Sequence, residues 1–301
     1  RGRPGGRRTG LLAARDAAVP ASARIPIGVN LTAIGVTSAW WVETARSLEA
    51  AGFQTVWCWD HFVSRGRLTD PCLECWMTLA VTAASTQRLR VGSFVTNVMN
   101  RHPAVLARMV ASLADAAGGR VELGIGIGGH PAEHRAYGID FPAAPERVER
   151  LAEAVQILRL LWSGGPVSFE GRHYRLRDAH AFPVPNPPPR VVIGGEKPGG
   201  ARLAARIGDA WTMNGRELER LEPVFREALE AAGRSRSEVG MVVALDLKRG
   251  AGAEEQPLFQ DLAGEMARWQ ERGADELVLH WVRPGEVAPL LAAAERAGLA
   301  G

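Results

Sequence analysis

Cysteine is scarce in this sequence, with three residues among 301, all between Cys58 and Cys75. So few cysteines, and an odd number of them, exclude a disulfide framework and favour a reducing compartment, so we expect a cytoplasmic protein. No run of about 18 apolar residues occurs, and we therefore expect no membrane-spanning helix. The sequence also lacks a dense basic patch interleaved with aromatic residues, and we expect no nucleic-acid partner although the pI is about 9.1.

The bulk composition is that of an ordinary soluble globular protein, with 46% hydrophobic and 23% charged residues. Residues 1–24 differ, because glycine and arginine dominate their beginning, "RGRPGGRR". We expect this segment to be a disordered or misassigned N-terminal extension. Arg7 and Arg8 loosely imitate a twin-arginine export signal, but Arg15 and Asp16 interrupt the apolar run that such a signal needs.

From residue 25 onward, short apolar runs alternate with longer stretches whose apolar residues recur at helical spacing. Eight such pairs predict a single (β/α)8 TIM barrel over residues 25–301, whereas an open doubly wound sheet has no reason to stop at eight regular units. The expected strands are 25–31, 54–60, 89–97, 120–129, 190–195, 209–214, 239–247 and 275–281. The expected helices are 39–52, 72–86, 103–118, 146–164, 199–208, 217–233, 257–273 and 286–298.

The regular alternation breaks between the fourth helix and the fifth strand. Residues 163–189 form an insertion that contains a predicted hairpin, "PVSFEGRHYRL", turning at Glu170 and Gly171. A proline-rich connector, "FPVPNPPP", follows it and is expected to be extended. In a barrel of this kind the active site lies at the C-terminal ends of the strands, so the residues that follow each strand are the candidates for function.

Asp60 and His61 follow the second strand, within a stretch that also has the spacing of a zinc site, C-x2-H-x10-C-x2-C, through Cys58, Cys72 and Cys75. A histidine can exchange a proton near neutral pH, and an adjacent carboxylate can orient it. The barrel separates the four zinc-ligand candidates, because Cys58 falls within a strand and the other two cysteines at the start of the next helix. We therefore predict no metal and place the chemistry on Asp60 and His61.

The glycines after the fourth strand, "GIGIGGHPAEH", match the dinucleotide pattern G-x-G-x-x-G, but no amphipathic helix is predicted before about residue 146, as that pattern would require. We interpret them instead as room for the backbone to lie against a planar ligand. His130 and His134 flank Glu133 at a spacing of four, but no third ligand follows at a fixed spacing, so no metal is predicted here.

Three further strand ends carry polar candidates. After the fifth strand, Gly194 and Gly195 precede Pro198 at an expected helix start, where free backbone N–H groups attract phosphate; Lys197, one of two lysines in the chain, adds positive charge. After the sixth strand, Asn214 and Arg216 could contact a polar or anionic group. After the eighth strand come His280 and Trp281, and strand alternation leaves one of them facing inward without saying which.

These motifs, taken in order, resemble the luciferase-like superfamily of flavin- and deazaflavin-dependent oxidoreductases, which are (β/α)8 barrels. The resemblance rests on "DHF" (60–62), "RHPAVLARMVASLADAAGGRVELGIGIGG" (101–129), "EHRAYGIDFP" (133–142), "LWSGGPVSFEGRHY" (161–174), "RVVIGG" (190–195) and "ARLAARIGDAW" (201–211). The Asp-His pair is similar to that of members that use coenzyme F420, a 5-deazaflavin.

The resemblance implies a hydride transfer between F420 and an unidentified small organic substrate. It places Asp60 against the cofactor, makes His61 the proton donor or acceptor, and puts a non-proline cis peptide between Phe94 and Val95. It also implies a homodimer. The cofactor contacts that it implies are Asp60, Phe94, Val95, Thr96, Asn97, Gly128, Gly129, His130, Gly194, Gly195, Glu196 and Lys197. The candidate substrate contacts are Arg65, Asn214, Arg216 and Trp281.

Two alternatives stay open at this point. The segment "GGHPAEHRAYG" (128–138) is equally similar to FMN-dependent monooxygenases of the superfamily, and a barrel that carries a flavin without catalysis is the third interpretation. Sugar-phosphate dehydrogenases of the F420 branch have a glutamate where this chain has Gly129, and a tryptophan where it has Arg65. These departures argue against a sugar phosphate as the substrate.

Overall fold

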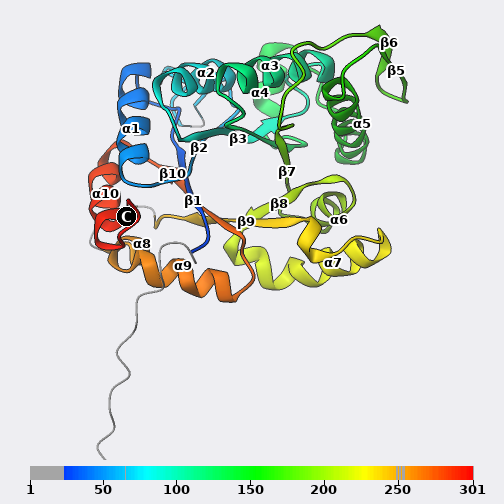
Figure 1. Ribbon diagram of the computed structural model, residues 1–301. Helices are drawn as coiled ribbons and strands as arrows, with labels where there is room; N and C mark the ends of the chain where they lie inside the picture. Colours follow the sequence, from blue (N-terminus) through cyan, green and yellow to red (C-terminus); the bar gives the residue numbers. More distant parts are fainter. Residues whose placement is uncertain (1–23, 65, 249, 251, 253–254, 301) are drawn as a thin grey trace, which may run out of the picture.

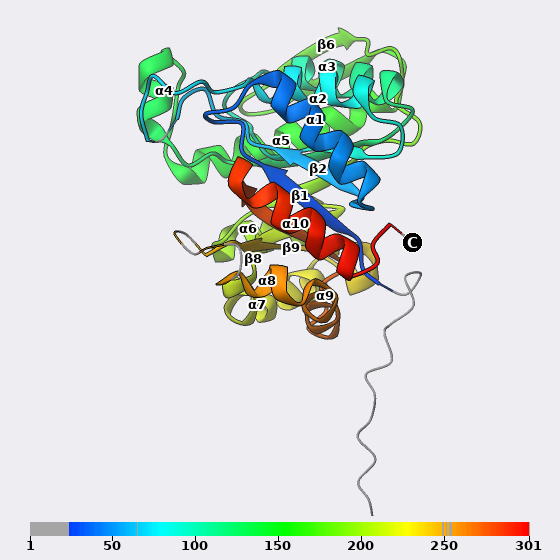
Figure 2. The same ribbon diagram turned by 90° about the vertical axis from the view of Figure 1, so that its left-hand side faces the viewer.

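A computed structural model describes residues 24–64, 66–248, 250, 252 and 255–300. Eight parallel strands close into a barrel in the order β1-β10-β9-β8-β7-β4-β3-β2, and helices cover its outside (Figures 1 and 2). The predicted (β/α)8 barrel is confirmed. The expected N-terminal extension, residues 1–24, lies outside the described residues except for Arg24.

The barrel strands agree with the apolar runs of the sequence. Their bounds are β1 (Ile27–Leu31), β2 (Thr55–Cys58), β3 (Arg90–Asn97), β4 (Val121–Gly126), β7 (Arg190–Gly194), β8 (Ala210–Asn214), β9 (Gly240–Asp246) and β10 (Glu276–Val282). The helices are α1 (Ser38–Ala50), α2 (Cys75–Ser85), α3 (Pro103–Ala116), α4 (Pro131–Tyr137), α5 (Ala144–Trp162), α6 (Pro198–Ile207), α7 (Leu218–Ala231), α8 (Pro257–Gln260), α9 (Leu262–Glu271) and α10 (Pro284–Arg296). None of the described helices has both the length and the hydrophobicity needed to cross a bilayer.

Helix α3 illustrates why these segments are helical. Pro103 occupies its first turn, where a missing N–H costs nothing, and the His102 side chain caps the helix by accepting a hydrogen bond from the backbone N–H of Ala104. Leu106, Val110 and other apolar residues on one face are buried against the barrel. The same amphipathic pattern turns the other long helices toward the strands.

The insertion forms the expected hairpin, which projects beside α5 in Figure 1. Its strands β5 (Val167–Glu170) and β6 (Arg175–Ala179) pair antiparallel, and the four residues 171–174 connect them. The predicted helices differ from the structure in three places. The single helix expected over 257–273 is divided at Asp261 into α8 and α9. Helix α2 begins at Cys75, because Glu74 caps it and Cys72 pairs with Ile34 in an isolated bridge. Helix α4 was missed, because seven residues are too few to show a period.

Inside the barrel, alternate residues of each strand fill the lumen. A small apolar cluster occupies its middle, formed by Trp57, Val192, Ala210, Val242 and Val278. Arg190 closes the N-terminal end by pairing with Glu122 at 2.7 Å and with Glu276. With the lower end filled by this ion network and the middle by apolar side chains, the opposite end is left for a site.

Candidate active site

Aromatic and imidazole rings gather at the C-terminal ends of the strands. This cluster, which we call the barrel mouth, consists of Trp59, His61, Phe94, His130, His280 and Trp281. Trp59 is at its centre, with its ring centroid 5.3 Å from that of His61, 5.7 Å from that of His280 and 4.5 Å from that of Trp281. The barrel mouth therefore combines flat apolar surface with imidazole rings, two of which, those of His61 and His280, contact the same indole.

Asp60 is buried and fixes the backbone on which His61 stands. Its carboxylate accepts two hydrogen bonds from Arg101, at 2.7 and 2.9 Å, one from the backbone N–H of Asn97 at 3.0 Å and one from Asn100 at 3.1 Å. Both oxygens are therefore used to tie the end of β2 to the end of β3. Direct contact of Asp60 with a cofactor stays a prediction; the structure gives the residue a positioning role.

His61 is paired with Glu133, which the sequence had not singled out as functional. His61 Nδ1 lies 2.9 Å from Glu133 Oε2, and the other carboxylate oxygen accepts hydrogen bonds from the backbone N–H groups of Phe62 and Val63. Burial alone would raise the pKa of Glu133, but the hydrogen bonds from His61 and from these two amides lower it overall. Glu133 is therefore a carboxylate that can accept a hydrogen bond from Nδ1 of His61, and Nε2 lies on the other side of the ring.

Glu133 comes from helix α4, which Figure 2 shows projecting at one end of the barrel. Pro131 at its start and Gly138 in a left-handed conformation after its end were the signals that could have predicted this helix. His134, one turn along the chain, is fully buried and hydrogen-bonded to Asn97 at 2.8 Å and to the carbonyl of His130 at 3.0 Å. His134 is therefore a structural residue, and its hydrogen bond uses the side-chain nitrogen of Asn97.

A second histidine and carboxylate pair lies at the barrel mouth, on β10 and β9. His280 Nδ1 is 2.7 Å from Asp246 Oδ1, and Asp246 Oδ2 accepts from Asn214 at 2.7 Å and from Arg216 at 3.4 Å. The hydrogen bond from His280 lowers the pKa of Asp246 and outweighs the opposing effect of burial. The predicted substrate contacts Asn214 and Arg216 are thus directed at Asp246, which the sequence interpretation missed.

Both residues at the end of β10 reach the barrel mouth, although alternation allowed only one. His280 faces inward, on the same side of the strand as Val278 of the luminal cluster. Trp281 has φ +65, and this left-handed conformation turns its ring back against Trp59. Arg65, the remaining predicted substrate contact, lies outside the described residues.

The cis peptide implied by the family resemblance is confirmed between Phe94 and Val95. The Val95 side chain accounts for two neighbouring glycines, because a Cβ at Gly126 or Gly194 would lie within 3.0 Å of it. Gly128 likewise leaves room for Asn97, and Gly195 for Gly200. Packing against Val95, Asn97 and Gly200 is enough to explain these glycines, and room for a planar ligand beside the glycines after β4 stays a prediction.

Several predicted cofactor contacts have polar atoms or open space that could be used by a ligand. The hydroxyl of Thr96 and Nδ1 of His130 are buried and have no hydrogen-bond partner among the described residues. Gly129 borders open space. Lys197 and Glu196 are exposed just before α6, whose first turn contains Pro198 as expected.

The sulfur of Cys72 contacts the backbone carbonyl of His61 at 3.4 Å, but this contact does not make a group of metal ligands. Within the described part of the chain no group of three or more potential metal ligands is found. Cys58, Cys72 and Cys75 direct their sulfurs at backbone carbonyls, and burial raises the pKa of Cys72 to about 11. These contacts are those of packing residues.

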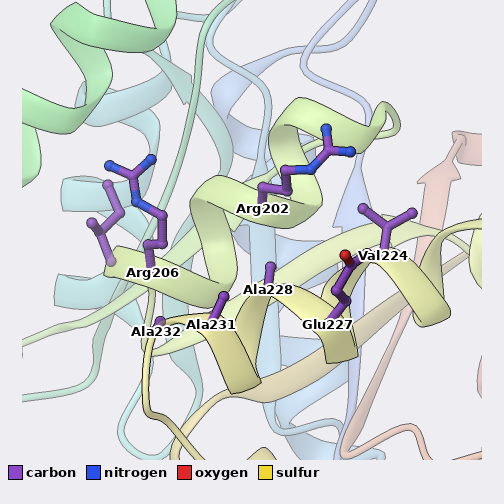
Figure 3. A pocket seen from close by; sticks show the side chains of 8 residues that line it. Arg202, Arg206, Val224, Glu227, Ala228, Ala231 and Ala232 are labelled. Carbon is purple, nitrogen blue, oxygen red and sulfur yellow. The ribbon is translucent and has the colours of Figure 1, made fainter.

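A separate groove of about 500 Å³ lies between α6 and α7, on the outside of the barrel (Figure 3). Arg202 and Arg206 stand on one side of it, and Glu227 and several alanines on the other. Its lining contains no histidine and no pair poised for proton exchange, so the barrel mouth is the better candidate for catalysis.

Comparison with known proteins identifies the family to which this sequence is similar. The model of the luciferase-like monooxygenase family matches residues 25–256. An F420-dependent glucose-6-phosphate dehydrogenase of Kineococcus radiotolerans is 35% identical over 68% of this chain and 62% of its own length. An F420-dependent hydroxymycolic acid dehydrogenase of Mycobacterium tuberculosis is 36% identical over 66% of this chain and 56% of its own length. The chain thus spans less than two thirds of the length of these two relatives.

Among solved structures, an F420-dependent secondary alcohol dehydrogenase in complex with an F420-acetone adduct superposes with a TM-score of 0.80. The superposition covers 92% of this chain and 99% of that one, at 21% identity. At this level of identity the similarity establishes the fold alone.

Proposed function

The chain belongs to the luciferase-like monooxygenase family, and on this premise we propose that it is an oxidoreductase that uses coenzyme F420 to dehydrogenate an alcohol or to reduce the corresponding carbonyl. The observation that carries the proposal is the His61 and Glu133 pair at the barrel mouth, joined at 2.9 Å. Dehydrogenation of a hydroxyl removes a proton from oxygen and a hydride from carbon, and this pair is built to handle the proton. The relatives named above are dehydrogenases described as F420-dependent, which supports the choice of cofactor.

The residues present fit an anionic cofactor with a flat ring. Phe94 and Trp59 supply apolar surface, and the buried His130 Nδ1 and Thr96 hydroxyl have no hydrogen-bond partner among the described residues, although His130 Nδ1 lies 3.7 Å from Glu133. The start of α6 offers backbone N–H groups beside Lys197, and no side chain caps it. We therefore assign the ring to the end of β3 and the phosphate to the start of α6.

F420, when bound, supplies the two-electron acceptor or donor that exchanges a hydride with the substrate carbon. The protein's own part is to exchange the proton. In oxidation, Nε2 of His61 accepts the hydroxyl proton, and in reduction the protonated ring returns it. Glu133 keeps Nδ1 protonated and stabilises the positive charge that the ring then carries. Asp60, held by Arg101, fixes the turn that orients this ring.

The side chains around His61 also limit the access of water. The His61 side chain is 20% exposed and that of Glu133 is 1% exposed. Trp59 covers one edge of the imidazole.

A homodimer and a cytoplasmic location stay predictions, and the substrate is expected to be a small molecule whose identity is open.

The decisive experiment offers the purified protein F420 and FMN separately and follows cofactor fluorescence. We expect F420 to bind and, in a screen of secondary alcohols, to be reduced. His61→Ala should abolish this turnover while the affinity for F420 stays within about threefold, because His61 acts on the proton rather than on the cofactor. Tight FMN binding with oxygen consumption, and no binding of F420, would establish the monooxygenase alternative. If F420 binds but no turnover that requires His61 is observed, the flavin-carrier alternative is supported.

A further inference from the structure

The His280 and Asp246 pair is not used by the proton exchange described above. It lies on β10 and β9, which in the closed order of the barrel stand across the lumen from β4 and β3. The end of β3 is where the cofactor ring is assigned. His280 therefore faces that position from the opposite wall, and its ring centroid is 5.9 Å from that of Phe94.

The arrangement of this pair is typical of a binding site, because the imidazole is held in one orientation. Asp246 binds Nδ1 at 2.7 Å and is itself held by Asn214 at 2.7 Å, so the imidazole is fixed in one orientation. Nε2 of His280 has no hydrogen-bond partner in the described portion of the chain, and the side chain is 25% exposed. A histidine that served only packing would resemble His134, which is fully buried with both nitrogens bonded.

His61 and His280 both contact the indole of Trp59. One hydroxyl needs one proton acceptor, and His61 already supplies it. The second imidazole therefore has capacity for a different polar atom of the same molecule. The flat rings of Trp59 and Trp281, 4.5 Å apart, offer apolar surface to the carbon atoms between the two polar atoms.

We propose that His280, oriented by Asp246, binds a second oxygen of the substrate through Nε2, and that the substrate is therefore a diol or hydroxy ketone rather than a simple alcohol or ketone. The inference rests on the proposed function, because it takes the reacting hydroxyl to be at His61. His280 acts in binding and specificity. A site built to bond a second oxygen discriminates against a molecule that lacks it, because the imidazole is then left without a partner.

The test compares matched probes: isopropanol with propylene glycol in oxidation, and acetone with hydroxyacetone in reduction, using F420 as the cofactor. His280→Asn keeps a donor near Nδ1 and removes the group at the position of Nε2, whereas His280→Gln keeps a donor near Nε2. In the unmodified protein, kcat/KM should be at least about tenfold higher for the two-oxygen probes. His280→Asn should raise KM for these probes about tenfold or more with little change in kcat, leave the one-oxygen probes unaffected, and be partly rescued in His280→Gln.

An equal effect of His280→Asn on both members of each pair overturns the inference. If the unmodified protein turns over none of the four probes, ¹⁵N NMR of the histidine rings in the F420-loaded protein decides. A shift of the His280 Nε2 signal on addition of propylene glycol or hydroxyacetone, absent with the one-oxygen probes, supports the inference, and no selective shift overturns it.

The two proposals fail in different ways. Failure of F420 to bind to the unmodified protein refutes the proposed function. Retained F420 binding and turnover, with a specificity indifferent to His280, refutes only the second-oxygen assignment. Loss of F420 affinity in both His280 variants also overturns the assignment, because it would place His280 against the cofactor.

Discussion

Replacement of Glu133 by glutamine tests the proton-exchange pair with little change in shape. In Glu133→Gln the amide oxygen can still accept hydrogen bonds from the backbone N–H groups of Phe62 and Val63, as Oε1 does now. The amide NH₂ then faces His61 Nδ1, which must become an acceptor. The neutral imidazole is thereby forced to carry its proton on Nε2, where it cannot accept the substrate's proton.

General base catalysis contributes about 10²- to 10⁴-fold to a rate, equivalent to about 2.7 to 5.4 kcal/mol of activation free energy. We expect Glu133→Gln to lose a factor within this range in kcat for alcohol oxidation. Affinity for F420 should change little, because Glu133 contacts the loop after β2 rather than the start of α6. Rapid-mixing measurement of F420 reduction gives the rate, and ¹⁵N NMR gives the tautomer of His61.

Glu49 provides a matched control. Its Oε1 accepts hydrogen bonds from the backbone N–H groups of Gln87, Arg88 and Leu89, at 2.6 to 2.8 Å, away from the barrel mouth. Glu49→Gln should leave kcat unchanged, so that a general effect of losing a loop-anchoring carboxylate is separated from the effect on His61. A kcat for Glu133→Gln within about threefold of the unmodified enzyme would refute the reasoning, since it would mean that the tautomer of His61 is irrelevant.

Three further predictions test the surroundings of the site. Asp60→Asn breaks a buried ion pair and should lower the free energy of unfolding by about 3 kcal/mol in urea titrations; a loss below about 1 kcal/mol would contradict the anchoring role. Gly126→Ala places a Cβ 2.9 Å from Val95 and should cost about 1 kcal/mol or more, whereas Gly129→Ala, with nothing within 4 Å, should be neutral in the same titration. Because the pKa of Cys72 is raised to about 11, its thiol stays protonated at neutral pH, and mass spectrometry should show slow alkylation in the folded protein that accelerates as the pH approaches that value.

The fold could be predicted because the strands are short apolar runs and the long helices have apolar residues at helical spacing. The exceptions were short. Helix α4 has seven residues, and its only sequence signals are the residues at its boundaries, Pro131 and Gly138. The start of α2 was misplaced because Cys72 pairs with Ile34, a contact that no local pattern encodes.

In the candidate site, the location of His61 at the barrel mouth could be predicted from its position along the chain, whereas its catalytic role stays a prediction. The rule that barrel strands end at the active site located His61, and the resemblance to F420 enzymes placed the cis peptide at Phe94. The partners of the two histidines could not be found this way, because Glu133 is 72 residues from His61 and Asp246 is 34 residues from His280. Such pairs arise only when the barrel closes.

A crystal structure of the protein with F420 bound tests the central claim most directly. We predict the deazaflavin ring at the barrel mouth beside Phe94 and Val95, its phosphate at the start of α6, and Nε2 of His61 facing the space where the substrate binds. F420 bound instead in the groove between α6 and α7, at Arg202 and Arg206, would contradict the assignment. So would a ring at the barrel mouth that left His61 hidden from the substrate.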